Sequence, residues 1–164
     1  MKISLKEAAL AYARHGWQVI PLNGKIPRTE YGYKDATTDP GIIEAWWNKW
    51  PDANVGIVTG AVSGLVVLDV DRHGEDGMKT LVDLEREYGS IPSTLQVKTG
   101  GGGIHYYFRY PKEGKAPCRT RIYPGIDIKG DGGYVVAPPS LHPDTHRPYE
   151  WIPRDSVEDS ERRP

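Results

Sequence analysis

Cysteine is nearly absent from this chain, since Cys118 is the only one among 164 residues. A single cysteine cannot form an internal disulfide, and it excludes the zinc sites that need several thiolates. Disulfides are common in small extracellular domains and rare in the cytoplasm. We therefore expect a cytoplasmic protein that binds no zinc.

Long hydrophobic runs are missing as well. No apolar stretch approaches the ~20 residues that cross a bilayer, and residues 1–4 lack the apolar segment of a signal peptide. The sequence thus predicts a protein that has no membrane partner.

Neither sign of charge is in excess, because 21 Lys and Arg stand against 22 Asp and Glu. Such a balance argues against a protein that binds nucleic acid over its whole surface. The charge is nevertheless uneven, since the stretch 98–129 holds seven basic residues and two acidic ones. This stretch could meet a polyanion, and a solvated loop would explain it as well.

The chain does contain clear helix signals, which predict helices over residues 5–15, 40–50 and 76–88. Ser4 and Glu7 have the spacing of a capping box before the first helix, and Asp39 can cap the second. Gly89 ends the third. The tryptophans of the second helix share one face, which favours a core stripe over a platform for stacked bases.

Strands are expected between these helices, over residues 17–22, 55–59, 65–71, 94–99, 104–110, 126–129, 134–137 and 149–152. Residues 23–37, rich in Gly, Pro and Lys, predict a long loop. The fold class that follows is α+β (mixed α/β), with a mixed sheet. We expect one core over residues 1–152 and a polar linker or tail over 153–164, leading to a further domain absent from this sequence.

The strongest chemical signal lies in residues 65–71, which read LVVLDVD. The apolar run predicts a strand buried on both faces. The negative charges of Asp69 and Asp71 at its end therefore need a partner that offsets the cost of burying them. Side chains alternate along a strand, and both carboxylates therefore point the same way. Such a pair suits Mg²⁺ or Mn²⁺, although a strand end that reaches water would also explain it. Similar pairs occur in glycosyltransferases and in phosphatases of the haloacid-dehalogenase type.

A third carboxylate recurs in the same setting, at Asp127 within the sequence GIDIK. Asp127 and Lys129 would share one face of a strand whose isoleucines face the core. Three acids and two divalent ions form the clamp used for in-line nucleotidyl transfer. A surface strand with an Asp-Lys neighbour pair is the alternative.

Four consecutive glycines between two expected strands form the third element. They cost chain entropy, so we interpret them as allowing a close approach of the backbone to a ligand such as a triphosphate. His105 follows them and can donate to a phosphate. The predicted nucleotide-binding residues are Lys98, Thr99, Gly100, Gly101, Gly102, Gly103, His105 and Lys129, with Lys25 as a weaker candidate. Residues expected to face nucleic acid are Arg109, Lys112, Lys115, Arg119 and Arg121.

In their order and spacing, these motifs resemble the N-terminal domain of bifunctional DNA primase/polymerases, the prim-pol domain of the archaeo-eukaryotic primase superfamily. The resemblance covers residues 8 to about 152. It rests on GWQVIPL (16–22), KIP (25–27), AT (36–37), WW (46–47), NVGIVTG (54–60), LDVD (68–71), the glycine loop to His105, GIDIKG (125–130) and VAPPS (136–140).

The resemblance implies a two-lobed catalytic core whose C-terminal lobe contains a sheet like that of RNA-recognition motifs. It further implies two ions, Mg²⁺ or Mn²⁺, held by Asp69, Asp71 and Asp127, and contact of His105 with the phosphates of the incoming nucleotide. Gly101 stands where members often carry serine, so a hydroxyl contact is missing or comes from Thr99.

The predicted function is therefore template-dependent nucleotidyl transfer by a DNA primase and DNA polymerase. The catalytic residues would be Asp69, Asp71, Asp127 and His105. Expected partners are a DNA template and primer, dNTP or NTP, and a helicase or helical accessory domain in the same or another chain. Similar cores occur in plasmid and phage replication proteins and in CRISPR-associated primase-polymerases. Two rivals stay open: a metal-dependent phosphohydrolase with Asp69 as nucleophile, and a non-catalytic module that binds single strands.

Overall fold

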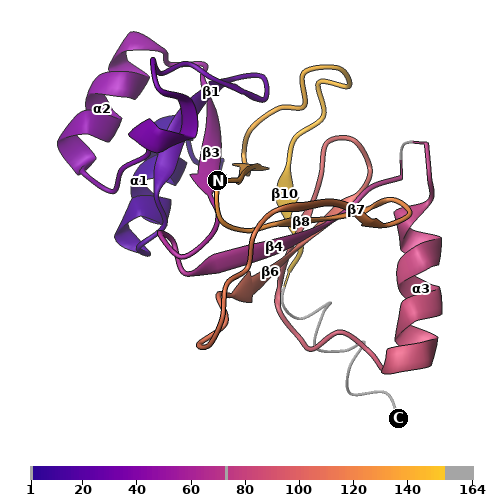
Figure 1. Ribbon diagram of the computed structural model, residues 1–164. Helices are drawn as coiled ribbons and strands as arrows, with labels where there is room; N and C mark the ends of the chain where they lie inside the picture. Colours follow the sequence, from indigo (N-terminus) through magenta and orange to yellow (C-terminus); the bar gives the residue numbers. More distant parts are fainter. Residues whose placement is uncertain (1, 73, 154–164) are drawn as a thin grey trace.

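The computed structural model describes residues 2–72 and 74–153. It contains two antiparallel sheets with helices packed on them (Figure 1). The expected α+β class is confirmed. Apart from Pro153, the predicted tail over 153–164 lies outside the described residues.

The first sheet has four strands in the order β2-β1-β3-β9. Its elements are α1 (Leu5–Arg14), β1 (Val19–Asn23), β2 (Ile26–Pro27), α2 (Pro40–Lys49), β3 (Asn54–Val58) and β9 (Tyr134–Ala137). The helices α1 and α2 pack on it at the indigo end of the chain (Figure 1).

The second sheet has six strands in the order β10-β5-β6-β4-β8-β7. Its elements are β4 (Leu65–Val70), α3 (Gly77–Tyr88), β5 (Leu95–Lys98), β6 (Ile104–Arg109), β7 (Arg119–Tyr123), β8 (Ile126–Lys129) and β10 (Glu150–Trp151). Figure 1 shows α3 at the opposite end of the molecule from α1 and α2. The strand that carries the acidic motif, β4, lies inside this sheet with β6 and β8 as its neighbours.

The predicted helix signals act as expected. The Ser4 hydroxyl accepts a hydrogen bond from the Glu7 backbone N–H (3.0 Å), and the Asp39 carboxylate accepts from the first turn of α2. Each side chain thereby satisfies N–H groups that have no partner within the helix. Gly89 ends α3 with a φ of 98°. In α2, Trp47 is 2% exposed and donates to the Ala53 carbonyl oxygen, as the core interpretation requires.

Three expectations about secondary structure are wrong. The predicted loop over 23–37 contains the short strand β2 and a 3-10 helix, Gly32–Asp35. Strand β7 was not predicted, because all five of its residues are exposed and no apolar alternation marks it. The mixed sheet is also wrong, since every pairing between the named strands is antiparallel. Short hairpins such as β5–β6 and β7–β8 permit only that direction.

Both faces of β4 are buried, as its apolar run predicts. Leu65 and Val67 belong to the main core, which also contains α1, α2 and the four-stranded sheet. Val70 faces the other way, into a small core beneath α3. Asp69 continues the row of Leu65 and Val67, so its carboxylate faces the four-stranded sheet.

Candidate functional site

The centre of the site is a row of three side chains across three neighbouring strands. Asp69 on β4 lies directly opposite His105 on β6 and directly opposite Asp127 on β8. Side chains in such cross-strand positions have Cβ atoms ~4.5–5.5 Å apart. The expected proximity of Asp127 to Asp69 is therefore found, although 58 positions separate them in the sequence.

The Asp69 carboxylate lies among basic groups. Its Oδ1 is 3.4 Å from His105 Nε2, an ion pair when the imidazole is protonated, and its side chain is 27% exposed. Burial raises the pKa of Asp69, but the hydrogen bond and charge of His105 and the charges of Lys129 and Lys25 outweigh it and lower the pKa. The carboxylate is thus held in its ionised form.

Around this carboxylate lies a cavity of about 380 Å³ between the two sheets. Lys25 lines it from the four-stranded side, and Asp69, His105 and Lys129 line it from the six-stranded side. Three cationic or proton-donating side chains beside one carboxylate suit a polyanion that arrives with cations of its own.

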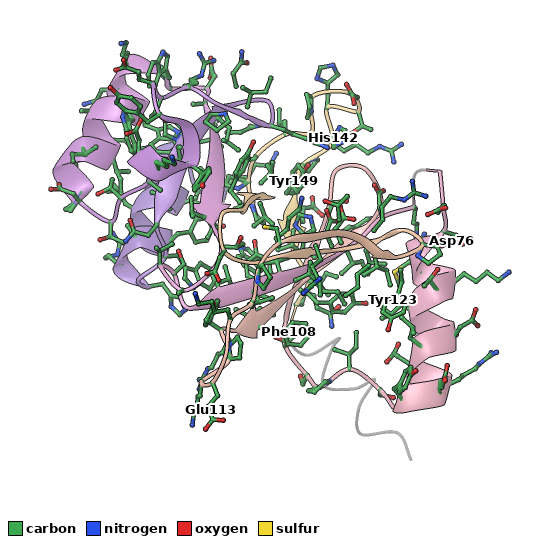
Figure 2. The ribbon with its side chains drawn as sticks, viewed as in Figure 1. Asp76, Phe108, Glu113, Tyr123, His142 and Tyr149 are labelled. Atoms are coloured by element: carbon green, nitrogen blue, oxygen red, sulfur yellow. The ribbon has the colours of Figure 1, made fainter. Side chains whose placement is uncertain are left out.

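Sequence reasoning missed Tyr149, whose ring centroid lies 6.2 Å from that of His105. Tyr149 also lines the cavity. Figure 2 labels this side chain between the two sheets. Burial and the negative charges of Asp69 and Asp71 raise its pKa to about 12. Its hydroxyl therefore stays protonated near neutral pH. No local pattern marks this residue, because it reaches the site only through the long connection after β9.

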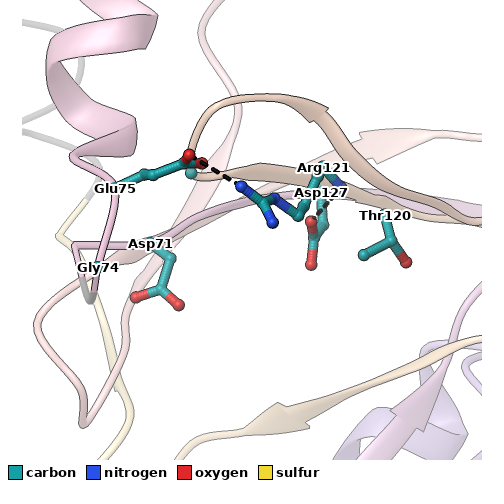
Figure 3. Close-up of a pocket in the computed structure, with 7 residues that line it drawn as sticks. Asp71, Gly74, Glu75, Thr120, Arg121 and Asp127 are labelled. Atoms are coloured by element: carbon teal, nitrogen blue, oxygen red, sulfur yellow. Dashed lines mark hydrogen bonds and ion pairs between the residues drawn. The ribbon is translucent and has the colours of Figure 1, made fainter.

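A second cavity of about 330 Å³ adjoins the other two acids and is drawn in Figure 3. Asp71, just after β4, and Asp127 line it together with Glu75 and Arg121. The Arg121 guanidinium forms an ion pair with Glu75 at 2.8 Å. Glu75 is another residue that sequence reasoning missed.

Strand β7 also holds the Asp127 carboxylate from the backbone. The Arg121 N–H donates to Asp127 Oδ1 at 2.6 Å, at a residue with a φ of 52°. The register of β7 and β8 shifts at this point, which is typical of a bulge that re-aims groups beside a site. Asp71 Oδ1 accepts from the Arg72 N–H at 2.7 Å.

The glycine loop has a structural explanation for two of its members. A Cβ at Gly100 would come within 2.5 Å of the Arg147 carbonyl oxygen and of His142 Cβ, and one at Gly103 would overlap the Val70 carbonyl oxygen. These glycines are therefore needed for close packing against protein, whereas our interpretation gave ligand approach as the reason. Gly102, with a φ of 93°, has open space beside it.

The two residues before this loop are placed differently from His105. Lys98 pairs with Ile104 and Glu150, one step out of phase with His105, so it faces the other side of the sheet. There it lines a separate cavity with Arg147. The Thr99 hydroxyl accepts a hydrogen bond from the Gly103 N–H at 2.9 Å.

The predicted nucleic-acid residues do not form one patch. Arg109 pairs with Leu65, at the end of β4 remote from the acids, and an exposed loop with Lys112 and Lys115 follows it. Figure 2 shows Glu113 of this loop projecting away from Tyr123, which ends β7. Arg119 and Arg121 on β7 lie beside the acids, and both are exposed.

The residue types at this corner fit hard divalent cations, because carboxylate oxygens are the preferred ligands of Mg²⁺ and Mn²⁺. The carboxylates themselves turn to separate partners: His105 for Asp69, and backbone N–H groups for Asp71 and Asp127. Within residues 2–72 and 74–153, no three His, Cys, Asp or Glu side chains gather closely enough to hold a metal ion. A loaded site therefore requires these side chains to turn. His105 Nδ1 is buried and has no hydrogen-bond partner in the described part of the chain, so this nitrogen is able to bind a polar ligand.

Comparison with known proteins identifies one family. The model of the bifunctional DNA primase/polymerase N-terminal domain matches residues 9–164. No curated protein matches the chain. Among the described residues, no helix has the length and apolar character needed to cross a membrane.

Proposed function

The chain belongs to the family of bifunctional DNA primase/polymerase N-terminal domains, and from this premise we propose that it extends a primer by two-metal nucleotidyl transfer. Membership implies a primase or polymerase activity in general, which acts on DNA and nucleotides and depends on divalent metal ions. In the proposed reaction, the primer 3'-hydroxyl oxygen bonds to the α-phosphorus of a dNTP or NTP opposite a DNA template. The hydroxyl proton passes to solvent water, the bond from the α-phosphorus to the bridging oxygen breaks, and pyrophosphate leaves.

The observation that carries this proposal is the row of His105, Asp69 and Asp127 across three adjacent strands. An acid that binds the metal and a side chain that donates a hydrogen bond to the phosphates must act on the same nucleotide, so they must be neighbours. The register makes them direct cross-strand pairs, beside a cavity lined by Lys25 and Lys129.

Asp69, Asp71 and Asp127 would hold the two ions, Mg²⁺ or Mn²⁺. When bound, such ions lower the pKa of the attacking hydroxyl and neutralise charge on the triphosphate. The low pKa of Asp69 supports this assignment, since the carboxylate is ionised and needs no proton removed before it binds a cation.

His105, Lys25 and Lys129 would bind the triphosphate within the shared cavity. Charge-assisted hydrogen bonds to phosphate oxygens orient the α-phosphorus toward the primer. The backbone N–H groups of the glycine loop, together with Lys98 and Thr99, remain proposed contacts. Contact of Lys98 with the same phosphates would require the loop to rearrange, because this lysine faces the other side of the sheet.

Arg119 and Arg121 are the better supported of the proposed nucleic-acid contacts. Both belong to the exposed edge strand β7, whose neighbour β8 carries Asp127. A template strand along this edge would bring the primer terminus beside the acids. Arg109, Lys112 and Lys115 would meet the duplex farther away.

For the biological setting, we propose replication of a plasmid, a phage or a similar element, or a CRISPR-associated process, in the cytoplasm. A helicase or helical accessory domain would then supply single-stranded template. The chain itself would carry the catalytic core over residues 1–152.

The deciding experiment incubates the chain with a primed template, Mn²⁺ and labelled deoxynucleotides, and measures extension and free phosphate together. We expect template-dependent extension with release of pyrophosphate. Release of phosphate without a template would instead indicate the phosphohydrolase, with Asp69 as its nucleophile. Binding of single strands without extension and without a need for divalent ions would indicate a non-catalytic module.

A further inference from the structure

Lys25 is the only cavity cation among the described residues that comes from the four-stranded sheet, and it lies in an exposed turn. Asn23 pairs with Ile26, so Gly24 and Lys25 form the two-residue turn between β1 and β2. Gly24 has the positive φ, 63°, that such a turn requires. Strand β2 has two residues and Ile26 is 70% exposed, so few contacts of the hairpin itself hold Lys25 near Asp69.

Two side chains, one from β3 and one from β9, bind the carbonyl groups of this turn. The Tyr134 hydroxyl donates to the Lys25 carbonyl oxygen at 2.7 Å, and Asn54 Nδ2 donates to the Gly24 carbonyl oxygen at 3.0 Å. Asn54 is itself fixed, because it also exchanges hydrogen bonds with the backbone of Leu141.

Tyr134 is suited to this task by its place in the chain. It begins β9, directly after the glycine-rich crossing from β8, and it lines the same cavity as Lys25. Burial raises the pKa of Tyr134, so its hydroxyl remains a donor at neutral pH. The hydroxyl donates its only proton to a backbone oxygen. It therefore has no proton to donate to the substrate.

We propose that Tyr134 is a positioning residue: its hydrogen bond to the Lys25 backbone holds the β1–β2 turn so that the Lys25 ammonium meets the triphosphate. The inference rests on the proposed function, because it assumes that the cavity binds a nucleoside triphosphate. In this inference Tyr134 fixes the position of Lys25, and the affinity for the nucleotide depends on the hydrogen bond between them. A lysine that is already held in place loses less conformational freedom when it binds phosphate.

The test is a double-mutant cycle with Tyr134→Phe, Lys25→Ala and the double variant. Binding of dGTP with Mg²⁺ is measured without primer, by calorimetry. We expect Lys25→Ala to weaken binding about tenfold or more, and Tyr134→Phe to weaken it about three- to tenfold, the effect of one neutral hydrogen bond. The double variant should bind about as weakly as Lys25→Ala alone, because Tyr134 acts through Lys25.

Steady-state extension gives the second readout. Tyr134→Phe should raise KM for the nucleotide by the same factor and leave kcat within about twofold, since the hydroxyl contacts no reacting group. Tyr88→Phe is the matched control, because this tyrosine is 75% exposed on α3 and should match the wild type in both assays. Thermal unfolding of every variant separates a local effect from a general loss of structure.

Each outcome has a distinct meaning. Effects of Tyr134→Phe and Lys25→Ala that multiply in the double variant overturn the inference and leave the proposed function standing. The inference is also overturned, and the proposed function left standing, if either single variant binds dGTP with wild-type affinity. The same holds if Tyr134→Phe loses kcat at unchanged KM. A wild-type chain that neither binds dGTP nor extends a primer overturns the proposed function, and the inference with it.

Discussion

Replacing Asp69 by asparagine should abolish primer extension and leave the fold nearly unchanged. The substitution keeps the shape of the side chain and removes its charge. The folded protein then loses the hydrogen bond between Asp69 and His105 Nε2 (3.4 Å) and the attraction of Lys25 and Lys129. It also loses the cost of burying a charged carboxylate, since burial by itself raises the pKa of Asp69.

These two effects on stability oppose each other. A hydrogen bond to a charged group contributes about 1.5–3 kcal/mol. Because the lower cost of burial offsets part of that loss, we expect the free energy of unfolding to fall by less than about 3 kcal/mol, which lowers the Tm by less than about 10 °C in a domain of this size.

Activity should respond very differently. The carboxylate charge of Asp69 is central among the three acids, and nothing else in the described residues replaces it in the cavity that holds His105, Lys25 and Lys129. We expect the extension rate to fall at least about 100-fold, or about 2.7 kcal/mol in activation free energy. Affinity for Mn²⁺, measured in the absence of nucleotide, should fall as well.

The assay is single-turnover extension of a labelled primer with Mn²⁺, accompanied by thermal unfolding. Asp83→Asn is the matched control, because Asp83 is an exposed acid of α3. Extension by Asp69→Asn within a few-fold of the wild-type rate would refute the reasoning. A Tm lower by more than about 10 °C would refute the stability estimate and attribute the lost activity to unfolding.

Four further predictions follow from single contacts. His105→Ala should raise KM for the nucleotide and slow turnover, and unchanged constants in steady-state extension would mean that this histidine is structural. Gly103→Ala should lower the free energy of unfolding by about 1–3 kcal/mol in urea denaturation, because its Cβ would overlap a carbonyl oxygen, and a stable variant would contradict that geometry. Glu75→Gln should change the free energy of unfolding by less than about 1 kcal/mol, since the ion pair with Arg121 is exposed. Because the variant frees the Arg121 guanidinium, it should bind single-stranded DNA more strongly and with a steeper dependence on salt. Unchanged binding would show that Arg121 does not contact nucleic acid. Burial raises the pKa of Tyr12 to about 12, so the stability that it contributes is complete below its unfolded pKa of ~10 and is lost as the pH rises toward 12; Tyr12→Phe should flatten this part of the stability profile.

Much of this protein could be derived from local patterns. The caps at Ser4 and Asp39, the helix end at Gly89 and the alternation of residues 65–71 are short-range effects of hydrogen bonding and side-chain direction, and each acts as expected. The resemblance to the family was likewise recognised from short segments and from their order along the chain.

The errors arose where local pattern carries little information. Strand β7 has no buried face, so its sequence lacks the alternation that reveals a strand. The close packing of Gly100 and Gly103 against protein was not foreseen, because the segments that crowd them are more than 30 positions away in the sequence. Contact of this loop with a ligand stays a prediction. Glu75 and Tyr149 were missed because neither belongs to a recognisable motif.

The sequence alone determined which side chains could do chemistry, because carboxylates, imidazole and ammonium groups have fixed properties and strands impose a period of two. Tertiary structure alone decided which of them meet. The register of β4 against β6 and β8 joins Asp69 to His105 and Asp127, and the register of β5 against β6 places Lys98 on the opposite face. The turn at Lys25 lines the same cavity, and Tyr134 and Asn54 bind its carbonyl groups from other strands. Such contacts depend on long-range pairing, in which a shift of one residue would turn every side chain to the other face.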